Sequence, residues 1–184
     1  MGFWPFYSDG ELRAMYAGGR ADKRARRLAR LWAVMFALGL LPRRWVTLEV
    51  TGRRTGRITR FPLGMAHYEG HWYLVPMLGE RCNWVQNVRA ADGRATLRRR
   101  RPVACQLIEV PVADRAPIIK RYLQTVPGAR PHIPVNRHAA LGQFAAIAPR
   151  YPVFLVVRSP HEAAVTCPGR GRRPEGCAAA DFSQ

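Results

Sequence analysis

The chain has 184 residues, of which 48% are hydrophobic, and carries a formal net charge of +18. The length fits one domain with appended tails, and the hydrophobic content excludes a wholly disordered chain. Lys23 and Lys120 are the only lysines, and this arginine bias is typical of a GC-rich genome. The charge therefore permits an anionic partner without identifying one.

The N-terminal region raises the question of membrane contact. Residues 3–7 are rich in aromatic side chains, Lys23–Arg30 is basic, and Leu31–Leu41 is an almost wholly apolar run of eleven residues. A bilayer span needs about 20 apolar residues, so this run is too short to cross. It either packs on the domain as a core helix or lies in a membrane interface. The side chains expected to enter the lipid are Trp32, Met35, Phe36 and Leu40.

The middle of the chain alternates like a small β-structure, with Val46, Leu48 and Val50 on one face of a first strand. Short strands of this kind, with helices inserted between them, favour a barrel, which removes sheet edges by closure. We therefore expect an α+β fold: a split β-barrel of six or so mostly antiparallel strands with flanking helices. The further strands are expected at Phe61–Tyr68, His71–Met77, Arg94–Arg99, Val103–Val112 and Tyr151–Arg158, and the helices at Asn83–Asp92, Asp114–Val126 and His138–Ala148.

The expected organisation has three parts. Residues 1–44 form a helical, apolar extension, residues 45–158 form the barrel, and residues 159–184 form a basic, disordered tail. The four cysteines, at positions 82, 105, 167 and 177, form no C-x-x-C pair and have no histidine at ligand spacing, so no metal site is expected. Cys167 and Cys177 either close a disulfide in the tail or stay reduced, as expected for a cytoplasmic protein.

The most informative segment is the turn between the first two strands, from Gly52 to Arg57. Glycines let a backbone bend tightly, and arginines with a threonine hydroxyl supply donors for an anion. The turn either binds a phosphate or carboxylate tail or is merely an exposed basic hairpin. The arginines of the later turn, Arg98–Arg101, have no interleaved aromatic residues, so a solvated hairpin is favoured over a specific nucleic-acid site.

Three motifs resemble the deazaflavin-dependent nitroreductase family. They are Gly52-Arg53-Arg54-Thr55-Gly56, then Pro62-Leu63, then Trp84-Val85-Gln86-Asn87-Val88-Arg89, and the resemblance covers roughly Val46 to Val112. It implies a split barrel that binds coenzyme F420 and transfers a hydride from F420H2 to a quinone, a nitroaromatic or a similar electron-poor acceptor. We further expect a small-molecule acceptor and a monomer or homodimer in the cytoplasm, located at the inner face of the membrane if the apolar run contacts lipid.

The resemblance also implies the residues that would bind the cofactor, while no catalytic residue is identified. Arg53, Arg54 and Thr55 would hold the phosphate and tail, and Pro62 and Leu63 would lie along the ring. The whole expected set is Arg53, Arg54, Thr55, Gly56, Arg60, Pro62, Leu63, Met77, Leu78, Gly79, Trp84, Asn87 and Arg89.

The chain also departs from the family pattern. Relatives have Ser-Lys-Gly-Gly where this chain has Met77-Leu78-Gly79-Glu80, so a cofactor-binding lysine is missing and Glu80 adds a repelling charge. Arg60 or Arg81 is expected to compensate. The alternatives are therefore an FMN-dependent reductase, or a non-catalytic barrel that carries a flavin, haem or lipid.

Several aromatic and histidine residues fit either a pocket or a core. A tyrosine near the acceptor can donate a hydrogen bond, but a buried tyrosine is more often a core residue. His132 is either a proton donor or an ordinary loop histidine. The tyrosines in question are Tyr68, Tyr73, Tyr122 and Tyr151.

Overall fold

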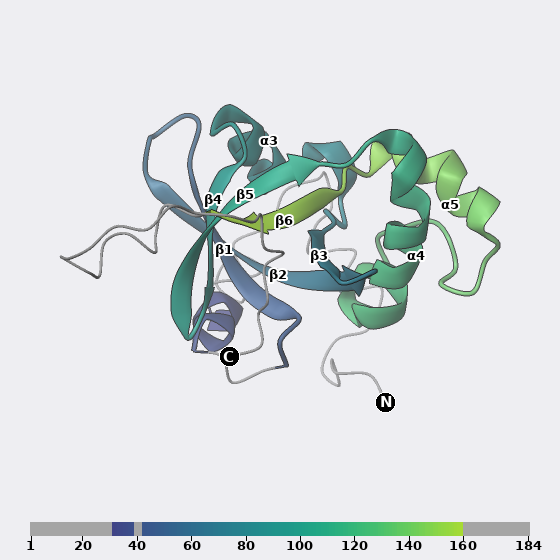
Figure 1. Ribbon diagram of the computed structural model, residues 1–184, viewed down its shortest axis with the longest axis horizontal. Helices are drawn as coiled ribbons and strands as arrows, with labels where there is room; N and C mark the ends of the chain where they lie inside the picture. Colours follow the sequence, from purple (N-terminus) through teal and green to yellow (C-terminus); the bar gives the residue numbers. More distant parts are fainter. Residues whose placement is uncertain (1–30, 39–41, 160–184) are drawn as a thin grey trace, which may run out of the picture.

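The computed structural model describes residues 31–38 and 42–159 (Figure 1). Residues 31–37 are helical. The strands are β1 (Trp45–Thr51), β2 (Ile58–Tyr68), β3 (His71–Leu74), β4 (Arg94–Arg99), β5 (Arg101–Glu109) and β6 (Phe154–Arg158). The α-helices after β1 are α3 (Asn83–Ala90), α4 (Arg115–Thr125) and α5 (Leu141–Ile147), and short 3-10 turns occupy Gly79–Arg81, Val112–Asp114, Pro127–Ala129 and Ala148–Arg150.

The strands form a closed antiparallel barrel in the order β1-β2-β3-β6-β5-β4. The register pairs Leu48 with Phe61 on β2 and with Leu97 on β4, so β1 is bonded on both edges and closes the barrel. This arrangement confirms the expected α+β barrel with flanking helices. Several bounds differ from the expected ones by three residues: β2 begins at Ile58, β3 ends at Leu74, β5 ends at Glu109, α5 begins at Leu141 and β6 begins at Phe154.

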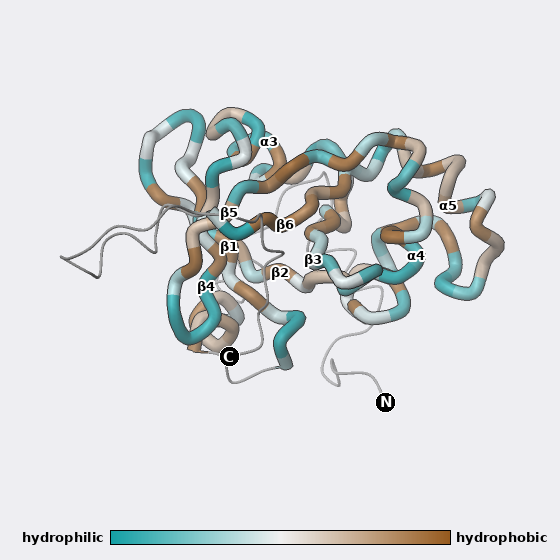
Figure 2. Tube along the Cα trace, viewed as in Figure 1, coloured by the Kyte–Doolittle hydropathy of each residue, from teal (hydrophilic) through white to brown (hydrophobic). Residues whose placement is uncertain are grey.

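Two apolar cores divide the fold. The predicted alternation on β1 is confirmed, because Val46, Leu48 and Val50 lie in the core inside the barrel, together with the buried face of α3. A second core lies between the outer face of the sheet and the helices, where Ile119, Leu123 and Phe144 are fully buried. Figure 2 shows apolar colouring along β5 and β6 and hydrophilic colouring on the β1–β2 and β4–β5 turns.

The helical segment 31–37 packs on the outside of β1, which the sequence left open. Phe36 is 3% exposed, and its ring lies 5.2 Å from that of Trp45 and 5.6 Å from that of Trp32. The hydroxyl of Thr47 donates to the carbonyl of Ala33 at 2.6 Å. For Trp32, Met35 and Phe36 the core-helix alternative is therefore confirmed over insertion into lipid, because these side chains pack against the protein core.

The opposite side of this helix carries the side chains that face outward. Leu31, Val34 and Leu38 are each more than half exposed. Within the described residues, no helix combines the length and hydropathy that a bilayer crossing requires.

Several expectations fall on residues that the structure does not describe. They are the aromatic start at residues 3–7, the basic run 23–30, Leu40, the tail beyond Ser159, and Cys167 and Cys177. The other two cysteines, Cys82 and Cys105, are buried free thiols. Burial raises the pKa of Cys82 to about 11 and that of Cys105 to about 12, so both remain protonated at neutral pH.

Candidate functional site

The turn between β1 and β2 is closed by its own backbone. The amide of Gly52 donates to the carbonyl of Arg57 at 2.9 Å, and the amide of Gly56 donates back to the carbonyl of Gly52 at 2.8 Å. Gly56 has φ of 66°, a left-handed conformation that favours glycine. The hydroxyl of Thr55 accepts a weak bond of 3.4 Å from the Arg57 amide. The turn therefore has a defined shape that directs its arginine side chains toward solvent.

Asn87 of α3 fixes the first of these arginines. Its side-chain oxygen accepts from the backbone amide of Arg53 at 3.3 Å and from Nη1 of the same residue at 2.9 Å. Asn87 is 5% exposed, so this amide is held by the packing of its helix. Two motifs separated by 34 residues in sequence thus meet in one contact. Figure 1 shows this turn beside α3 at one end of the barrel.

The turn retains its positive charge. Arg53, Arg54 and Arg57 are exposed, and within residues 31–38 and 42–159 none of them forms an ion pair with a carboxylate. The partner of Arg53 is an amide, which orients the guanidinium without neutralising it. Three uncompensated guanidinium groups suit a ligand that carries a phosphate and several carboxylates. The donor set of this turn therefore fits the tail of F420.

Arg60, in contrast, lies in a separate ion cluster. Its Nε is 2.8 Å from Oε1 of Glu49, and Nε of Arg98 is 2.9 Å from the same oxygen. Burial opposes ionisation of Glu49, but the hydrogen bonds from Arg98 and then Arg60 outweigh it and hold its pKa below the ordinary value. Because one carboxylate pairs with two arginines, the positive charge of Arg60 is only partly compensated. Its side chain is 64% exposed.

Glu80 does not act as an unpaired negative charge. Nη2 of Arg89 lies 3.0 Å from Oε1 of Glu80 and 2.8 Å from Oε1 of Glu109. The hydrogen bond from Arg89 lowers the pKa of Glu80, with burial acting in the opposite direction. Arg89 is thus the residue that pairs with Glu80, while the replacement of the missing cofactor-binding lysine by Arg60 or Arg81 stays a prediction. Its own charge is shared between two carboxylates.

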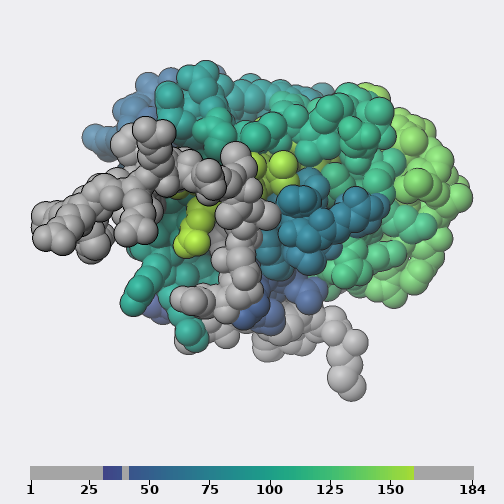
Figure 3. All heavy atoms as spheres, in the orientation of Figure 1, coloured from purple at the N-terminus to yellow at the C-terminus, as the bar shows by residue number. Residues whose placement is uncertain are grey.

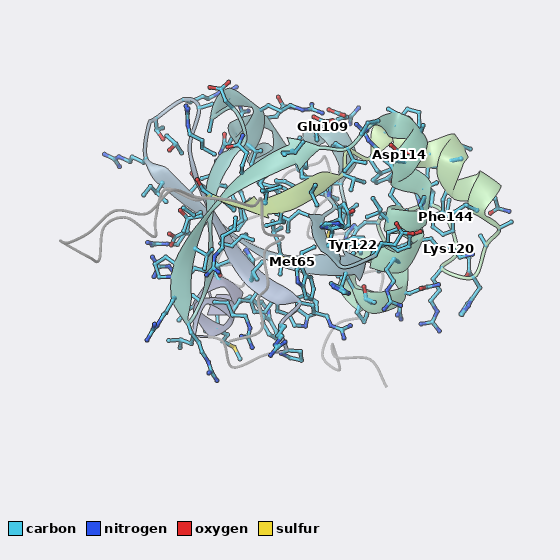
Figure 4. The ribbon with its side chains drawn as sticks, viewed as in Figure 1. Met65, Glu109, Asp114, Lys120, Tyr122 and Phe144 are labelled. Atoms are coloured by element: carbon cyan, nitrogen blue, oxygen red, sulfur yellow. The ribbon has the colours of Figure 1, made fainter. Side chains whose placement is uncertain are left out.

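The network continues into the helical end of the fold. Arg115, at the start of α4, is 6% exposed and places Nη2 2.9 Å from Oε1 of Glu109. Its Nε donates to the carbonyl of Val110 at 2.8 Å. Figure 4 shows Glu109 near the start of α4, close to Asp114. Sequence reasoning missed Glu109 and Arg115, because no local pattern links Glu109 to Arg89, which lies 20 positions before it in the chain.

The apolar residues of the expected cofactor-binding set divide between the two faces of the sheet. Leu63, Leu78 and Trp84 pack in the core inside the barrel, where the Trp84 ring lies 5.5 Å from that of Phe154. Met77 packs in the outer core. Pro62 precedes Leu63 in β2, so its ring points to the opposite face.

Gly79 is required for packing in this region. It has φ of 64°, and a Cβ placed on it would come within 2.5 Å of the carbonyl oxygen of Arg150.

The tyrosines differ in burial. Tyr73, Tyr122 and Tyr151 are buried, and burial raises the pKa of each hydroxyl. Tyr151 donates a long hydrogen bond of 3.4 Å to the carbonyl of His132. These three therefore have the environment of core residues. Tyr68 alone is partly exposed, and it lines a cavity near α4 that contains none of the expected cofactor residues.

The closed antiparallel barrel thus carries, at one end and beside α3, an exposed turn whose three arginines are accessible to an anionic ligand. The comparison with known families identifies the class further. The F420H(2)-dependent quinone reductase family matches residues 24–130, which is more than half of the chain. The chain belongs to this family, and it is an F420H2-dependent oxidoreductase with coenzyme F420 as its cofactor.

Comparison with curated proteins found no match. Among solved structures, the chain is similar to an F420-H2 dependent reductase (FDR-A), with 18% identity, 62% of this chain and 94% of that chain covered, and a TM-score of 0.42. It is also similar to a heme binding protein from Mycobacterium smegmatis, with 12% identity, 69% and 51% covered, and a TM-score of 0.44. A FAD-binding protein from Mesorhizobium loti has 13% identity, 70% and 88% covered, and a TM-score of 0.42. The assignment is based on the family match.

Proposed function

We propose that this protein transfers a hydride from F420H2 to a quinone, and that the turn from Gly52 to Arg57 binds the phosphate and acidic tail of the cofactor. The observation that carries the proposal is the contact of Asn87 with Arg53, beside two further arginines that have no carboxylate partner among the described residues. A fixed guanidinium binds an anion with less loss of side-chain freedom than a mobile one does.

In this mechanism the reduced cofactor supplies the hydride, and the protein binds and orients it. Arg53 and Arg54, with the hydroxyl of Thr55, hold the tail, and Gly56 keeps the turn open to it. Arg60 adds a second, weaker cation near β1. Pro62, on the outer face of β2, would lie along the ring. Leu63, Leu78 and Trp84, packed inside the barrel, and Met77, packed in the outer core, would hold the surrounding strands and α3 in place. Arg89 compensates the negative charge of Glu80 by forming an ion pair with it, so that this carboxylate does not repel the tail.

The experiment is a fluorescence titration of purified protein with F420, and separately with FMN, at two salt concentrations. We expect the double variant Arg53→Ala, Arg54→Ala to bind F420 at least tenfold more weakly, since charge-assisted bonds contribute about 1.5–3 kcal/mol each. The control is Arg101→Ala, Arg158→Ala, which removes the same charge from exposed positions on β5 and β6. An equal loss of F420 affinity in both double variants would show that only the net charge of the protein matters, not the position of the arginines in the turn.

The titration with FMN tests the remaining alternatives. FMN has one phosphate and no acidic tail, so the turn gives it fewer contacts than F420. If FMN binds more tightly than F420 does, the proposed cofactor of this site becomes FMN. If the protein binds neither F420 nor FMN, a non-catalytic barrel that carries haem or lipid becomes the favoured function.

We also propose that the enzyme works in the cytoplasm at the inner face of the membrane, where quinones dissolve. The apolar side chains of Leu31, Val34 and Leu38 lie on one outward face. The carbonyl of Ala37, in the same helix, accepts from the backbone amide of Arg100 at 2.6 Å, which places the exposed arginines of the β4–β5 turn beside this face. Apolar side chains flanked by arginines match an anionic lipid surface.

Vesicle co-sedimentation tests this location. We expect binding to vesicles that contain phosphatidylglycerol, little binding to phosphatidylcholine vesicles, and a loss in the variant Leu31→Gln, Val34→Gln. The control is Ile108→Gln, which alters an exposed apolar residue on β5. If the helix variant instead dissociates a dimer in analytical ultracentrifugation, the face is a homodimer interface.

A further inference from the structure

A cavity of about 440 Å³ lies at the opposite end of the molecule from the Gly52–Arg57 turn. Its walls are the outer side of α4, the β2–β3 turn and the first residue of α5. The cavity is open to solvent, and its volume matches the roughly 300–1,000 Å³ of small-molecule sites. β2 joins the two ends, and its 11 residues span about 33 Å at the usual strand rise. A ligand in this cavity is therefore separate from a ligand tail held by the turn.

One face of α4 supplies the charge of the cavity. Pro117, Lys120, Arg121 and Gln124 line it, and their spacing places them along one side of the helix. The opposite side, with Ile119 and Leu123, is fully buried. Neither Lys120 nor Arg121 forms an ion pair within the part of the chain that the structure describes. Figure 4 shows Lys120 on α4, and in Figure 3 the green atoms of α4 and α5 form this end of the surface.

Arg121 is held in position by the strand beside it. Its Nε donates to the carbonyl of His67 at 3.2 Å, which leaves its other guanidinium nitrogens for a ligand. Lys120 projects from the preceding position and has no such restraint. The cavity therefore presents one oriented cation and one mobile cation side by side.

The β2–β3 turn supplies the third polar group. Glu69 has φ of 48° and Gly70 has φ of 78°, so the turn places a glutamate where Asn or Gly is usual. Interaction with the neighbouring Glu69 carboxylate raises the pKa of the Tyr68 hydroxyl. Glu69 contributes one negative charge against the two positive charges of Lys120 and Arg121, so the cavity has an excess of positive charge.

The remaining walls are apolar. Pro117 and the ring of Tyr68 line the cavity, and so does Leu141, whose side chain is 49% exposed. We propose that this cavity is a second ligand site, for a small amphipathic carboxylate. The carboxylate lies toward Lys120 and Arg121, and the hydrocarbon or aromatic part rests on Pro117, Tyr68 and Leu141.

The test uses three probes of similar shape and different charge: benzoate, benzyl alcohol and benzylamine. Each is titrated into the ¹⁵N-labelled full chain at fixed salt, and amide shifts are followed. We expect benzoate to shift the amides of residues 118–124, residues 68–70 and Leu141. The two uncharged or cationic probes should give weaker shifts there.

The variants fix the chemistry. Lys120→Gln should weaken benzoate binding by roughly two- to fivefold, the range expected for one exposed charge pair. Glu69→Gln should strengthen it, because a repelling carboxylate is removed. Arg158→Gln removes an exposed cation from β6 and should leave the affinity unchanged. All three positions are partly or fully exposed, and an unperturbed amide spectrum before titration shows that each variant is folded.

Three results would overturn the proposal. They are benzoate shifts confined to the Gly52–Arg57 turn or absent altogether, equal affinity for benzyl alcohol, and an unchanged affinity in Lys120→Gln. None of these readouts depends on F420, so the outcome is independent of the proposed reductase activity.

Discussion

At the residue scale, variants of Asn87 separate two contributions of the turn to F420 binding: the orientation of Arg53 and the positive charge of the arginines. Replacing it with alanine removes the acceptor for both hydrogen bonds from Arg53. Because the amide is buried, we expect a loss of about 1–3 kcal/mol in the free energy of unfolding and weaker F420 binding. Urea unfolding and the F420 titration measure the two effects.

The matched variant Asn87→Asp keeps an acceptor oxygen but adds a negative charge beside Arg53. We expect it to retain more stability than Asn87→Ala. We also expect it to bind F420 more weakly than the native protein does, and no more tightly than Asn87→Ala does. If Asn87→Asp binds F420 as tightly as the native protein, the charge of this turn does not hold the cofactor.

Gly79 gives a second prediction at this scale, because its environment can be compared with that of Gly70. A Cβ at Gly79 would clash with the Arg150 carbonyl, whereas a Cβ at Gly70 would meet nothing within 4 Å. Both residues have positive φ, so both alanine variants carry backbone strain of about 1–2 kcal/mol. We expect Gly79→Ala to lower the melting temperature well beyond Gly70→Ala in a thermal scan. Equal losses would mean that conformation alone explains this glycine.

At the element scale, the helical segment 31–37 is part of the folded unit. Phe36 is buried against Trp45, whereas Val34 in the same helix is 57% exposed. We expect Phe36→Ala to cost about 3–5 kcal/mol and Val34→Ala to cost under about 1 kcal/mol, by urea unfolding. A small effect of Phe36→Ala would show that the barrel is stable without this helix.

The helix also explains a pattern that the strand alone does not. Thr47 and Glu49 lie on the face of β1 that alternation assigns to solvent, yet both are buried. The hydroxyl of Thr47 donates a hydrogen bond to the carbonyl of Ala33, and two arginines form ion pairs with Glu49. The polar residues of β1 thus mark the place where another element covers the strand.

At the scale of the whole molecule, paired carboxylates make stability depend on pH. Hydrogen bonds from arginines lower the pKa of both Glu49 and Glu80 below the ordinary value of 4.5. A carboxylate with a lowered folded-state pKa stabilises the fold above its unfolded-state pKa, and this contribution is lost as the pH falls through the folded-state value. We expect the melting temperature to fall as the pH is lowered from about 5 toward 3.

The variant Glu49→Gln tests this dependence. It removes one of the titrating groups, so its melting temperature should start lower at pH 7 and decline less steeply with acid. A decline parallel to that of the native protein would show that Glu49 contributes no pH-dependent stability. Glu80 is more exposed than Glu49, so a smaller change is expected from Glu80→Gln.

The sequence by itself determined the barrel class, most of the strands and helices, and the family. These depend on local periods and on ordered motifs: alternation along β1 and the helical spacing of Ile118, Ile119, Tyr122 and Leu123 both follow from backbone geometry. The glycine-rich basic turn was recognisable because its residues are consecutive in the chain.

Only the tertiary structure decided which charges are free. Arg53, Arg60 and Arg89 look alike in the sequence, but barrel closure and helix packing give them an amide, a shared carboxylate and two carboxylates as partners. Those partners lie between 9 and 34 residues away, and local patterning carries no information on such contacts. The inward face of helix 31–37 was likewise fixed by the shape of the sheet that it covers, because hydrophobicity on all sides of a helix does not select one face.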